Sequence, residues 1–179
     1  MELFDIVDDQ DRVTGQAPRS EVHAQNLKHR AVHIFVVRPE GTLLMQKRSL
    51  SKDLFGGDWT TSCSGHVDAG ENYSTASRRE LYEELGIKLE PTYTLNPLFK
   101  VPACSKTGDE FVEIYVLTWT GEIVLNPNEI SAGRWVSQPE LMHWVETSPG
   151  VFAPSFLYIL EQWEHLHPDS LKMLFKKLD

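Results

Sequence analysis

The sequence predicts a single domain of the α+β class, and three observations support this prediction. The chain has 179 residues, of which 41% are hydrophobic and 24% charged, values typical of a folded domain with its own core. Short apolar stretches typical of strands alternate along the chain with segments of helical periodicity. No repeat, low-complexity tract or linker interrupts the chain, so residues 1–179 are expected to form one domain.

Strands are predicted from alternating or continuous apolar residues, with turns where Pro, Gly and Asp cluster between them. The first strand, 3–7, alternates in polarity and ends at the acidic turn 8–11. The most apolar run, 31–37, is followed by a turn at 39–41 that leads into the next strand. The predicted strands are, in chain order, 3–7, 31–37, 42–47, 59–62, 92–101, 111–120 and 134–136.

Helices are predicted where the apolar period changes from two residues to 3.6. In the segment 73–85, Leu81 and Leu85 share one face, Asn72 suits the N-cap, and Gly86 suits the position after the last turn. Proline or aspartate marks the start of each of the last three helices. The predicted helices are 20–26, 73–85, 139–146, 154–165 and 169–177, and the last three form a C-terminal helical segment of about 139–179.

The charge balance limits the classes of partner. With 26 acidic and 17 basic residues, the formal net charge is -9, which argues against a nucleic-acid polymer because phosphate backbones attract basic surfaces. No apolar run suits a membrane span or a signal peptide, and Cys63 and Cys104 form no CxxC pair. A cytoplasmic protein with reduced thiols and no membrane association is therefore expected. Such a protein can still bind phosphates through a divalent cation.

The segment 65–87, GHVDAGENYSTASRRELYEELGI, concentrates carboxylates on one helix. Glu80, Glu83 and Glu84 lie on one side of it, although like charges four residues apart destabilise a helix by about 0.2–0.5 kcal/mol per pair. A helix that tolerates this arrangement is either well solvated there or holds a cation. Mg²⁺ and Mn²⁺ prefer oxygen ligands and often combine carboxylates with the phosphates of a substrate.

The whole segment resembles the Nudix box, conventionally written G-x5-E-x7-R-E-U-x-E-E-x-G-U, where U is a bulky aliphatic residue. Its fixed positions are filled without a gap by Gly65, Glu71, Arg79, Glu80, Leu81, Glu83, Glu84, Gly86 and Ile87. The order of predicted strands and helices also suits the Nudix fold. The resemblance therefore implies an α/β/α sandwich around a mixed β-sheet.

The resemblance implies hydrolysis of a diphosphate bond in a nucleoside-diphosphate-linked or similar small molecule, by water attack on phosphorus with Mg²⁺ or Mn²⁺ as cofactor. Carried over by position, Glu80, Glu83 and Glu84 become metal ligands, with the Gly65 carbonyl as a further one. A box glutamate, Glu83 or Glu84, or Glu113 outside the box, would orient or deprotonate the water. The supporting residues would be Glu71 and Arg79, whose ion pair pins the loop to the helix.

Several charged residues outside the box have two possible roles. Glu113 and Glu129 are candidates for an additional metal ligand or base, or are ordinary surface glutamates. Arg48 and Lys52 could bind the phosphates of the substrate, or belong to a solvated basic loop. His66 directly follows the box glycine, where it either binds substrate or packs the loop.

A second resemblance is to the type I isopentenyl-diphosphate isomerases, which share the Nudix fold but move a double bond. It is carried by residues 11–15, 48–52 and 59–66. Those enzymes have a cysteine two residues before a metal-binding histidine, and relative to His66 this chain has Ser64 there. Serine is a far weaker acid, and Cys63 would point to the opposite face of a strand. Phe111 stands where one of the isomerase's paired glutamates is expected.

The intact box and these departures favour a hydrolase, while an isopentenyl-diphosphate isomerase and a non-catalytic Nudix-fold ligand sensor stay open as alternatives. His23, His29 and His33 are spaced too irregularly to predict a metal site, and His33 is interpreted as a core or edge residue of its strand. Aromatic residues near the C-terminus are interpreted as core packing, or alternatively as a lid or the contact of a homodimer. They are Trp144, Phe152, Phe156, Tyr158 and Trp163.

Overall fold

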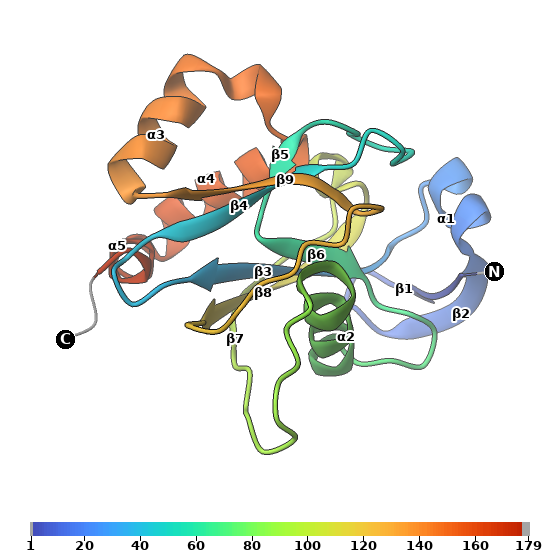
Figure 1. Cartoon of the computed structure of the whole chain (residues 1–179). Coiled ribbons are helices and arrows are strands. Elements are labelled where there is room, and N and C mark those ends of the chain that lie inside the picture. Colours follow the sequence, from blue (N-terminus) through green and yellow to red (C-terminus); the bar gives the residue numbers. More distant parts are fainter. Residues whose placement is uncertain (1, 177–179) are drawn as a thin grey trace.

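The computed structural model describes residues 2–176 and places helices on both faces of a mixed sheet (Figure 1). The strands are β1 (Leu3–Val7), β2 (Val13–Pro18), β3 (His29–Val37), β4 (Leu43–Arg48), β5 (Trp59–Thr60), β6 (Cys63–His66), β7 (Pro97–Val101), β8 (Glu110–Thr118) and β9 (Ile130–Val136). The helices are α1 (Arg19–Gln25), α2 (Tyr73–Leu85), α3 (Gln138–Thr147), α4 (Pro154–Leu166) and α5 (Pro168–Leu174), with short 3-10 turns η1 (Ser105–Thr107) and η2 (Pro149–Val151).

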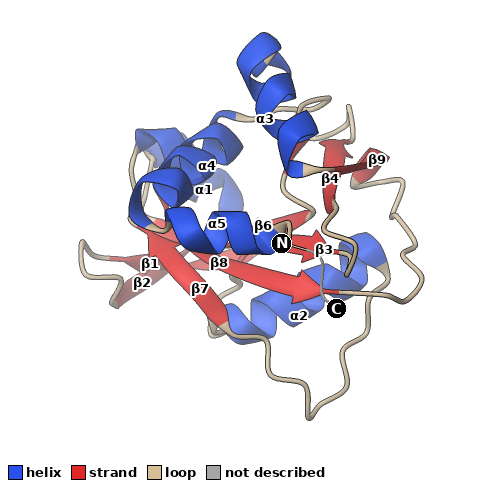
Figure 2. Cartoon of the chain, turned by 90° about the vertical axis from the view of Figure 1, so that its left-hand side faces the viewer, coloured by secondary structure: helices blue, strands red, loops and turns tan. Residues whose placement is uncertain are grey.

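The large sheet is built around β3 and β8, which pair in parallel along nine residues. Its strand order is β5-β4-β3-β8-β7, with β6 added to β3 and β9 added to β4, and these other pairings are antiparallel. Figure 2 shows α4 and α5 on one side of β3 and β8 and α2 on the other. This arrangement confirms the predicted α/β/α sandwich.

Successive side chains of β3 point to opposite faces of the sheet and contribute to the two layers of the core. Val32, Ile34 and Val36 pack in the cluster that contains the apolar face of α2, and Phe35 and Val37 pack in the cluster that contains α4. The predicted bounds of α2 are confirmed at both ends. The side chain of Asn72 accepts a hydrogen bond from the backbone N–H of Thr75, and Gly86 takes the left-handed conformation that ends the helix.

A separate N-terminal hairpin of β1 and β2 leads into α1 and has its own small core, made of Phe4, Ala17 and Val22. Asp11 in its turn fastens the hairpin to the main sheet. The carboxylate accepts hydrogen bonds from the Nε of Arg30 at 2.6 Å, the hydroxyl of Tyr73 at 2.8 Å and the Nζ of Lys100 at 2.8 Å. The hairpin thereby brings Phe4 and α1 to the start of β3, where both lie beside His29.

The predicted elements differ from the observed ones mainly where strands are polar. Two strands were not predicted because neither shows an apolar alternation: β2, which is mostly exposed, and β6, which reads Cys-Ser-Gly-His. The strand predicted at 92–101 begins only at Pro97, since the preceding residues form a loop. The predictions for residue 1 and residues 177–179 lie outside the described residues.

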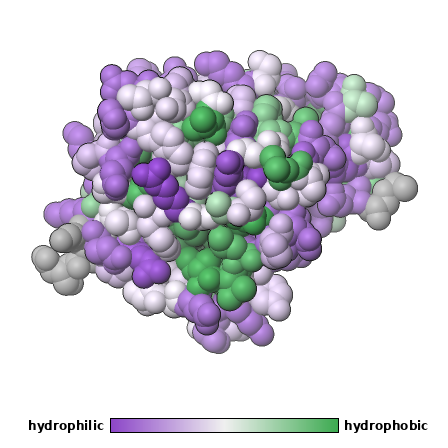
Figure 3. Space-filling view, turned by 45° about the horizontal axis from the view of Figure 1, so that its top comes forward, coloured by the Kyte–Doolittle hydropathy of each residue, from purple (hydrophilic) through white to green (hydrophobic). Residues whose placement is uncertain are grey.

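The C-terminal aromatic residues belong chiefly to the core, which confirms the packing interpretation. Phe152, Phe156 and Trp163 are almost fully buried against the sheet, and Trp144 and Tyr158 pack at the margin of the same cluster. The face shown in Figure 3 is mostly hydrophilic, with apolar side chains gathered below its centre. Among residues 2–176, no helix combines the length and apolar character required to cross a bilayer.

Candidate active site

A cavity of about 740 Å³ opens between α2, the first half of β3, strand β6 and the loop that follows β4. Two groups of side chains meet at it. The carboxylate cluster consists of Glu80, Glu83 and Glu84 on α2, and the histidine cluster consists of His23, His29, His66 and Glu110. Strand β6 touches both, because the backbone N–H of Ser64 bonds to Glu84 and the side chain of His66 bonds to Glu110.

Two members of the carboxylate cluster are buried, and burial changes their titration. Burial and the neighbouring charge of Glu84 raise the pKa of Glu80 to about 8, while the Arg79 guanidinium opposes this shift. Burial likewise raises the pKa of Glu84 to about 7, although its hydrogen bond from the Ser64 N–H lowers it. Glu83 is half exposed. Two buried carboxylates so close together need a cation to keep both ionised.

Arg79 supplies part of that cationic charge and holds the loop before α2. Its Nη1 donates to Glu80 at 2.6 Å and to Glu83 at 3.2 Å, and its Nη2 donates to Glu71 at 2.9 Å. Nη2 also donates to the carbonyl of His66 at 2.9 Å. The predicted ion pair of Glu71 with Arg79 is therefore present, and it ties the glycine loop to the carboxylate helix.

The carboxylate cluster offers oxygen ligands for a hard divalent cation. Its three glutamates lie on one side of α2 and line the same cavity, and the backbone of Gly65 packs directly against the Glu80 side chain. Oxygen donors of this kind are the ligands that Mg²⁺ and Mn²⁺ prefer. The residues that could hold the ion are Glu80, Glu83, Glu84 and the Gly65 carbonyl.

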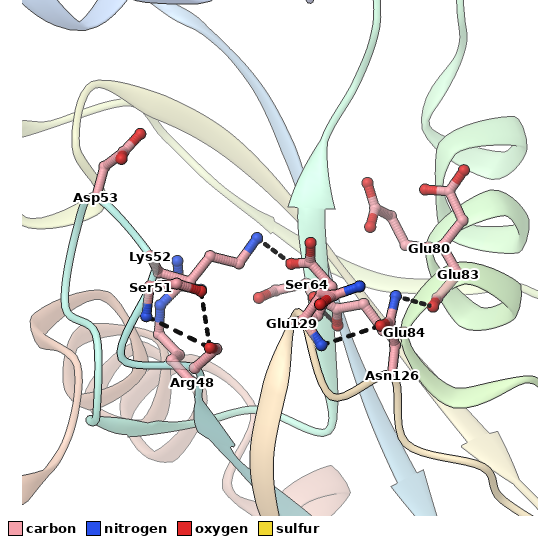
Figure 4. A network of polar contacts seen from close by, with 12 residues as sticks. Arg48, Ser51, Lys52, Asp53, Ser64, Glu80, Glu83, Glu84, Asn126 and Glu129 are labelled. Carbon is pink, nitrogen blue, oxygen red and sulfur yellow. Dashed lines mark hydrogen bonds and ion pairs between the residues drawn. The ribbon is translucent and has the colours of Figure 1, made fainter.

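The predicted phosphate-binding residues face the carboxylates from the opposite wall (Figure 4). Lys52 forms an ion pair with Glu129, and both line the cavity. Arg48 also lines it, with its Nε donating to the carbonyl of Leu54. Asn126 clamps the Glu129 loop to α2, because its Nδ2 donates to the Glu83 carbonyl at 3.1 Å.

The structure brings three histidines together, although their irregular spacing in the sequence predicted no metal site. His23 comes from α1, His29 from the start of β3 and His66 from β6, and one ring nitrogen of each lies within 4.8 Å of the others. Nε2 of His23 and Nε2 of His29 are buried without a hydrogen-bonding partner. Phe4 stacks on the rings of His29 and His66, with centroids 5.6 and 4.6 Å apart. These histidines are therefore close together in the fold although their spacing in the sequence is irregular.

Glu110 completes the histidine cluster and was not singled out from the sequence, where the comparison with the isomerases concerned its neighbour Phe111. Its Oε1 accepts a hydrogen bond from Nε2 of His66 at 3.0 Å and lies 3.4 Å from Nε2 of His29. Burial alone would raise the pKa of Glu110, but the two imidazoles lower it well below its usual range. Imidazole nitrogens with one carboxylate suit Zn²⁺, Mn²⁺ or Fe²⁺ better than Mg²⁺.

The remaining candidates divide between the cavity and its surroundings. Ser64 lines the cavity, whereas Cys63 is fully buried and packs in the α2 layer of the core. Glu113 does not line the cavity. Its carboxylate accepts a hydrogen bond from Tyr115 and lies 3.5 Å from the Nζ of Lys100. The structure therefore does not bring Glu113 together with the other predicted site residues.

The family model described as NUDIX domain matches residues 27–156, which include both β3 and the box helix α2. The chain belongs to the Nudix family. At the level of the family it is a Nudix hydrolase, and its α/β/α sandwich is the Nudix fold.

Similar proteins in the Nudix family carry two kinds of name. The chain is 33% identical over 173 residues to an isopentenyl-diphosphate Delta-isomerase from Burkholderia multivorans, covering 89% of this chain and 96% of that protein. It is 32% identical over 163 residues to an uncharacterized Nudix hydrolase from Yersinia pestis, covering 91% and 86%. The crystal structure of DR0079 from Deinococcus radiodurans superposes with a TM-score of 0.72 at 32% identity, covering 82% and 90%. Family membership alone therefore does not specify the reaction.

Proposed function

We propose that this Nudix protein is a divalent-metal-dependent pyrophosphohydrolase that cleaves a diphosphate bond in a nucleoside-diphosphate-linked or similar small molecule. The observation that carries the proposal is the carboxylate cluster. Glu80, Glu83 and Glu84 line one wall of a cavity whose opposite wall bears Arg48 and Lys52. A cation on one wall and basic side chains on the other can hold a diphosphate between them.

Each residue of the cluster has a proposed task. Glu80, Glu83 and Glu84, with the Gly65 carbonyl, would hold Mg²⁺ or Mn²⁺. When bound, the ion supplies neutralisation of phosphate charge and a lower pKa for a coordinated water. Glu83 is half exposed, so its carboxylate can also orient the attacking water or take its proton. Glu84 is fixed by Ser64 and by the Nε2 of Gln46 at 3.1 Å, which suits a rigid ligand.

The expected partner is a small diphosphate-containing molecule. The cavity has the volume of a small-molecule site. Its lining combines basic with acidic side chains, which suits a small phosphate-containing ligand better than a nucleic-acid polymer. Cys63 and Cys104 are both free thiols, which supports the expected cytoplasmic location. A homodimer stays a prediction from the sequence.

The test is a panel of diphosphate substrates with Mg²⁺ and with Mn²⁺, applied to the wild type and to Glu84→Gln. The variant removes a ligand charge and keeps the side-chain size, so it should lose most of the phosphate release and bind Mg²⁺ more weakly in calorimetry, while remaining folded. Glu164→Gln, on the exposed surface of α4, is the matched control and should behave as the wild type. Wild-type turnover by Glu84→Gln at saturating Mg²⁺ would contradict the assignment. Binding without any phosphate release would favour a ligand sensor.

A second candidate function, isopentenyl-diphosphate isomerisation, is favoured by the histidine cluster and by similarity to several proteins that are named isopentenyl-diphosphate Delta-isomerases. Ser64 argues against it, because a hydroxyl is a poor proton-transfer group. Incubation with isopentenyl diphosphate separates the two reactions. Formation of an allylic isomer without phosphate release would show that the protein is an isomerase. Full hydrolytic activity of Ser64→Ala would support the hydrolase proposal.

A further inference from the structure

His33 lies in the wall of the cavity that is formed by β3. It pairs in register with Ser64 of β6, and both residues line the cavity together with Ala31. The side chain of His33 is only 5% exposed. A polar ring held this firmly in the wall of a substrate-sized cavity presents one fixed chemical group to whatever enters.

Thr61 determines which nitrogen of this ring carries the proton. Nδ1 of His33 lies 3.0 Å from Oγ1 of Thr61, and the same hydroxyl lies 3.3 Å from the carbonyl oxygen of Cys63. A hydroxyl has one proton, and a carbonyl oxygen only accepts. Both contacts are hydrogen bonds only when Nδ1–H donates to Thr61 and Thr61 donates to Cys63. The proton of the neutral ring therefore resides on Nδ1.

The other ring nitrogen, Nε2, is left as a hydrogen-bond acceptor. Burial lowers the pKa of His33 to about 4, with the Glu110 charge opposing and the Arg48 and His66 charges adding to the shift, so the ring is neutral near pH 7. Within residues 2–176 no group bonds to Nε2 of His33. Nε2 of His33 is also accessible. In residues 2–176, the side-chain nitrogens that are fully buried and lack a hydrogen-bonding partner are Nε2 of His23 and Nε2 of His29.

We propose that Nε2 of His33 accepts a hydrogen bond from a hydroxyl or amine on the organic part of the diphosphate substrate. The inference rests on the proposed function, since the carboxylate cluster and the basic wall would hold the diphosphate end. His33 lines the same cavity as Arg48 of the basic wall and Glu110 of the histidine cluster.

The proposal assigns a substrate class. A hydroxyl or amine donor satisfies Nε2, as a sugar or nucleoside can. A hydrocarbon chain at the same place would exclude water from Nε2 without replacing the hydrogen bond. The free-energy cost of a buried, unpaired acceptor exceeds the net stabilisation that one hydrogen bond provides. His33 thereby favours polar diphosphate esters over hydrocarbon ones of the same length.

Calorimetry with non-cleavable ligands tests this preference. The probes are methylenediphosphonate, which has no P–O–P bond, its short alkyl esters, and hydroxyalkyl esters of equal chain length, each with Mg²⁺. In the wild type, the best hydroxyalkyl ester should bind about tenfold more tightly than its alkyl counterpart. In His33→Phe this ratio should fall to about one, because the acceptor is gone, while methylenediphosphonate itself binds as before. Thr61→Val should weaken the preference for hydroxyalkyl esters, because it removes the hydrogen bond that keeps the proton on Nδ1. Thr92→Val, at an exposed position, is its control.

Two results would overturn the proposal: an unchanged ratio in folded His33→Phe, or a wild type with no hydroxyl preference at any chain length. Failure of the wild type to bind methylenediphosphonate at all would instead count against the diphosphate site, and the His33 proposal would fall with it. ¹⁵N NMR of the imidazole gives an answer that needs no substitution at His33. The free protein should show a protonated Nδ1 and a bare Nε2, and a protonated Nε2 would contradict the assignment.

Discussion

The carboxylate of Glu80 occupies the space in which any side chain at position 65 would begin. A Cβ on Gly65 would lie 2.0 Å from both Cδ and Oε1 of Glu80, far inside van der Waals contact. The backbone of Gly65 is not in the left-handed region, so the glycine is required by this close approach and not by its conformation. The first glycine of the box therefore serves the carboxylate cluster directly.

Gly65→Ala should displace Glu80 and damage the site. A misplacement of about 1 Å at a catalytic centre costs roughly a hundredfold in rate, so we expect kcat/KM to fall by about that factor. The atoms in the way are the far end of a flexible side chain, so the free energy of unfolding should change by less than about 1 kcal/mol. Gly15→Ala is the control, because a Cβ there meets nothing within 4 Å. Steady-state kinetics and urea unfolding measure both effects, and normal activity of Gly65→Ala would show that Glu80 need not hold this position.

Lys52 should matter for substrate binding more than for stability. Its ion pair with Glu129 is partly exposed, so breaking it should change the free energy of unfolding by less than about 1 kcal/mol. A hydrogen bond to a charged phosphate contributes about 1.5–3 kcal/mol, so Lys52→Met should raise KM by about tenfold or more. Lys88→Met, on an exposed residue after α2, is the control. An unchanged KM would place the phosphates elsewhere.

The histidine and carboxylate clusters should bind metals independently. Glu80→Gln combined with Glu84→Gln should weaken Mg²⁺ binding and leave one Zn²⁺ or Mn²⁺ site, because imidazoles and Glu110 supply its ligands. His29→Gln should remove that site, whereas His165→Gln on α4 should not. Metal analysis after dialysis gives the stoichiometry. Loss of both metals in a single-cluster variant would show that the clusters form one site.

The carboxylate helix was predictable in detail because its information is local. Asn72, the 3.6-residue period and Gly86 fix both ends of α2, and the spacing of its glutamates fixes the face they share. The histidine cluster was not predictable, because its members come from α1, β3 and β6, and their meeting depends on how the N-terminal hairpin docks. Asp11 controls that docking through contacts with distant residues, which no local pattern reveals.

Strand β6 was missed for a related reason. Sequence patterns detect strands through apolar alternation, and β6 is polar because Ser64 and His66 face the cavity. His33 is buried, which confirms its interpretation as a core residue of an apolar strand. Its place in the cavity wall and its contact with Thr61 depend on the neighbouring strands and could not be predicted from the local sequence.

His33 also predicts how stability depends on pH. Its pKa is about 4 in the folded protein and about 6.5 when unfolded, so the unfolded chain binds more protons between these values. The free energy of unfolding should therefore fall as the pH drops from about 6.5 to about 4. Near pH 4.5 this one group accounts for a loss of roughly 2.5 kcal/mol relative to neutral pH, taken as an upper value.

His33→Gln removes this titration and keeps a polar side chain of similar reach, so its stability should decline less on acidification. Urea unfolding of both proteins at about pH 7, 5.5 and 4.5 gives the comparison. Glu80, Glu84 and Glu110 also titrate with shifted pKa values, but they do so in both proteins, and their contributions largely cancel in the difference. His165→Gln, on an exposed residue, should retain the wild-type slope. Parallel curves for the wild type and His33→Gln would mean that the ring accepts a proton in the folded state, and its Nε2 would then be a donor.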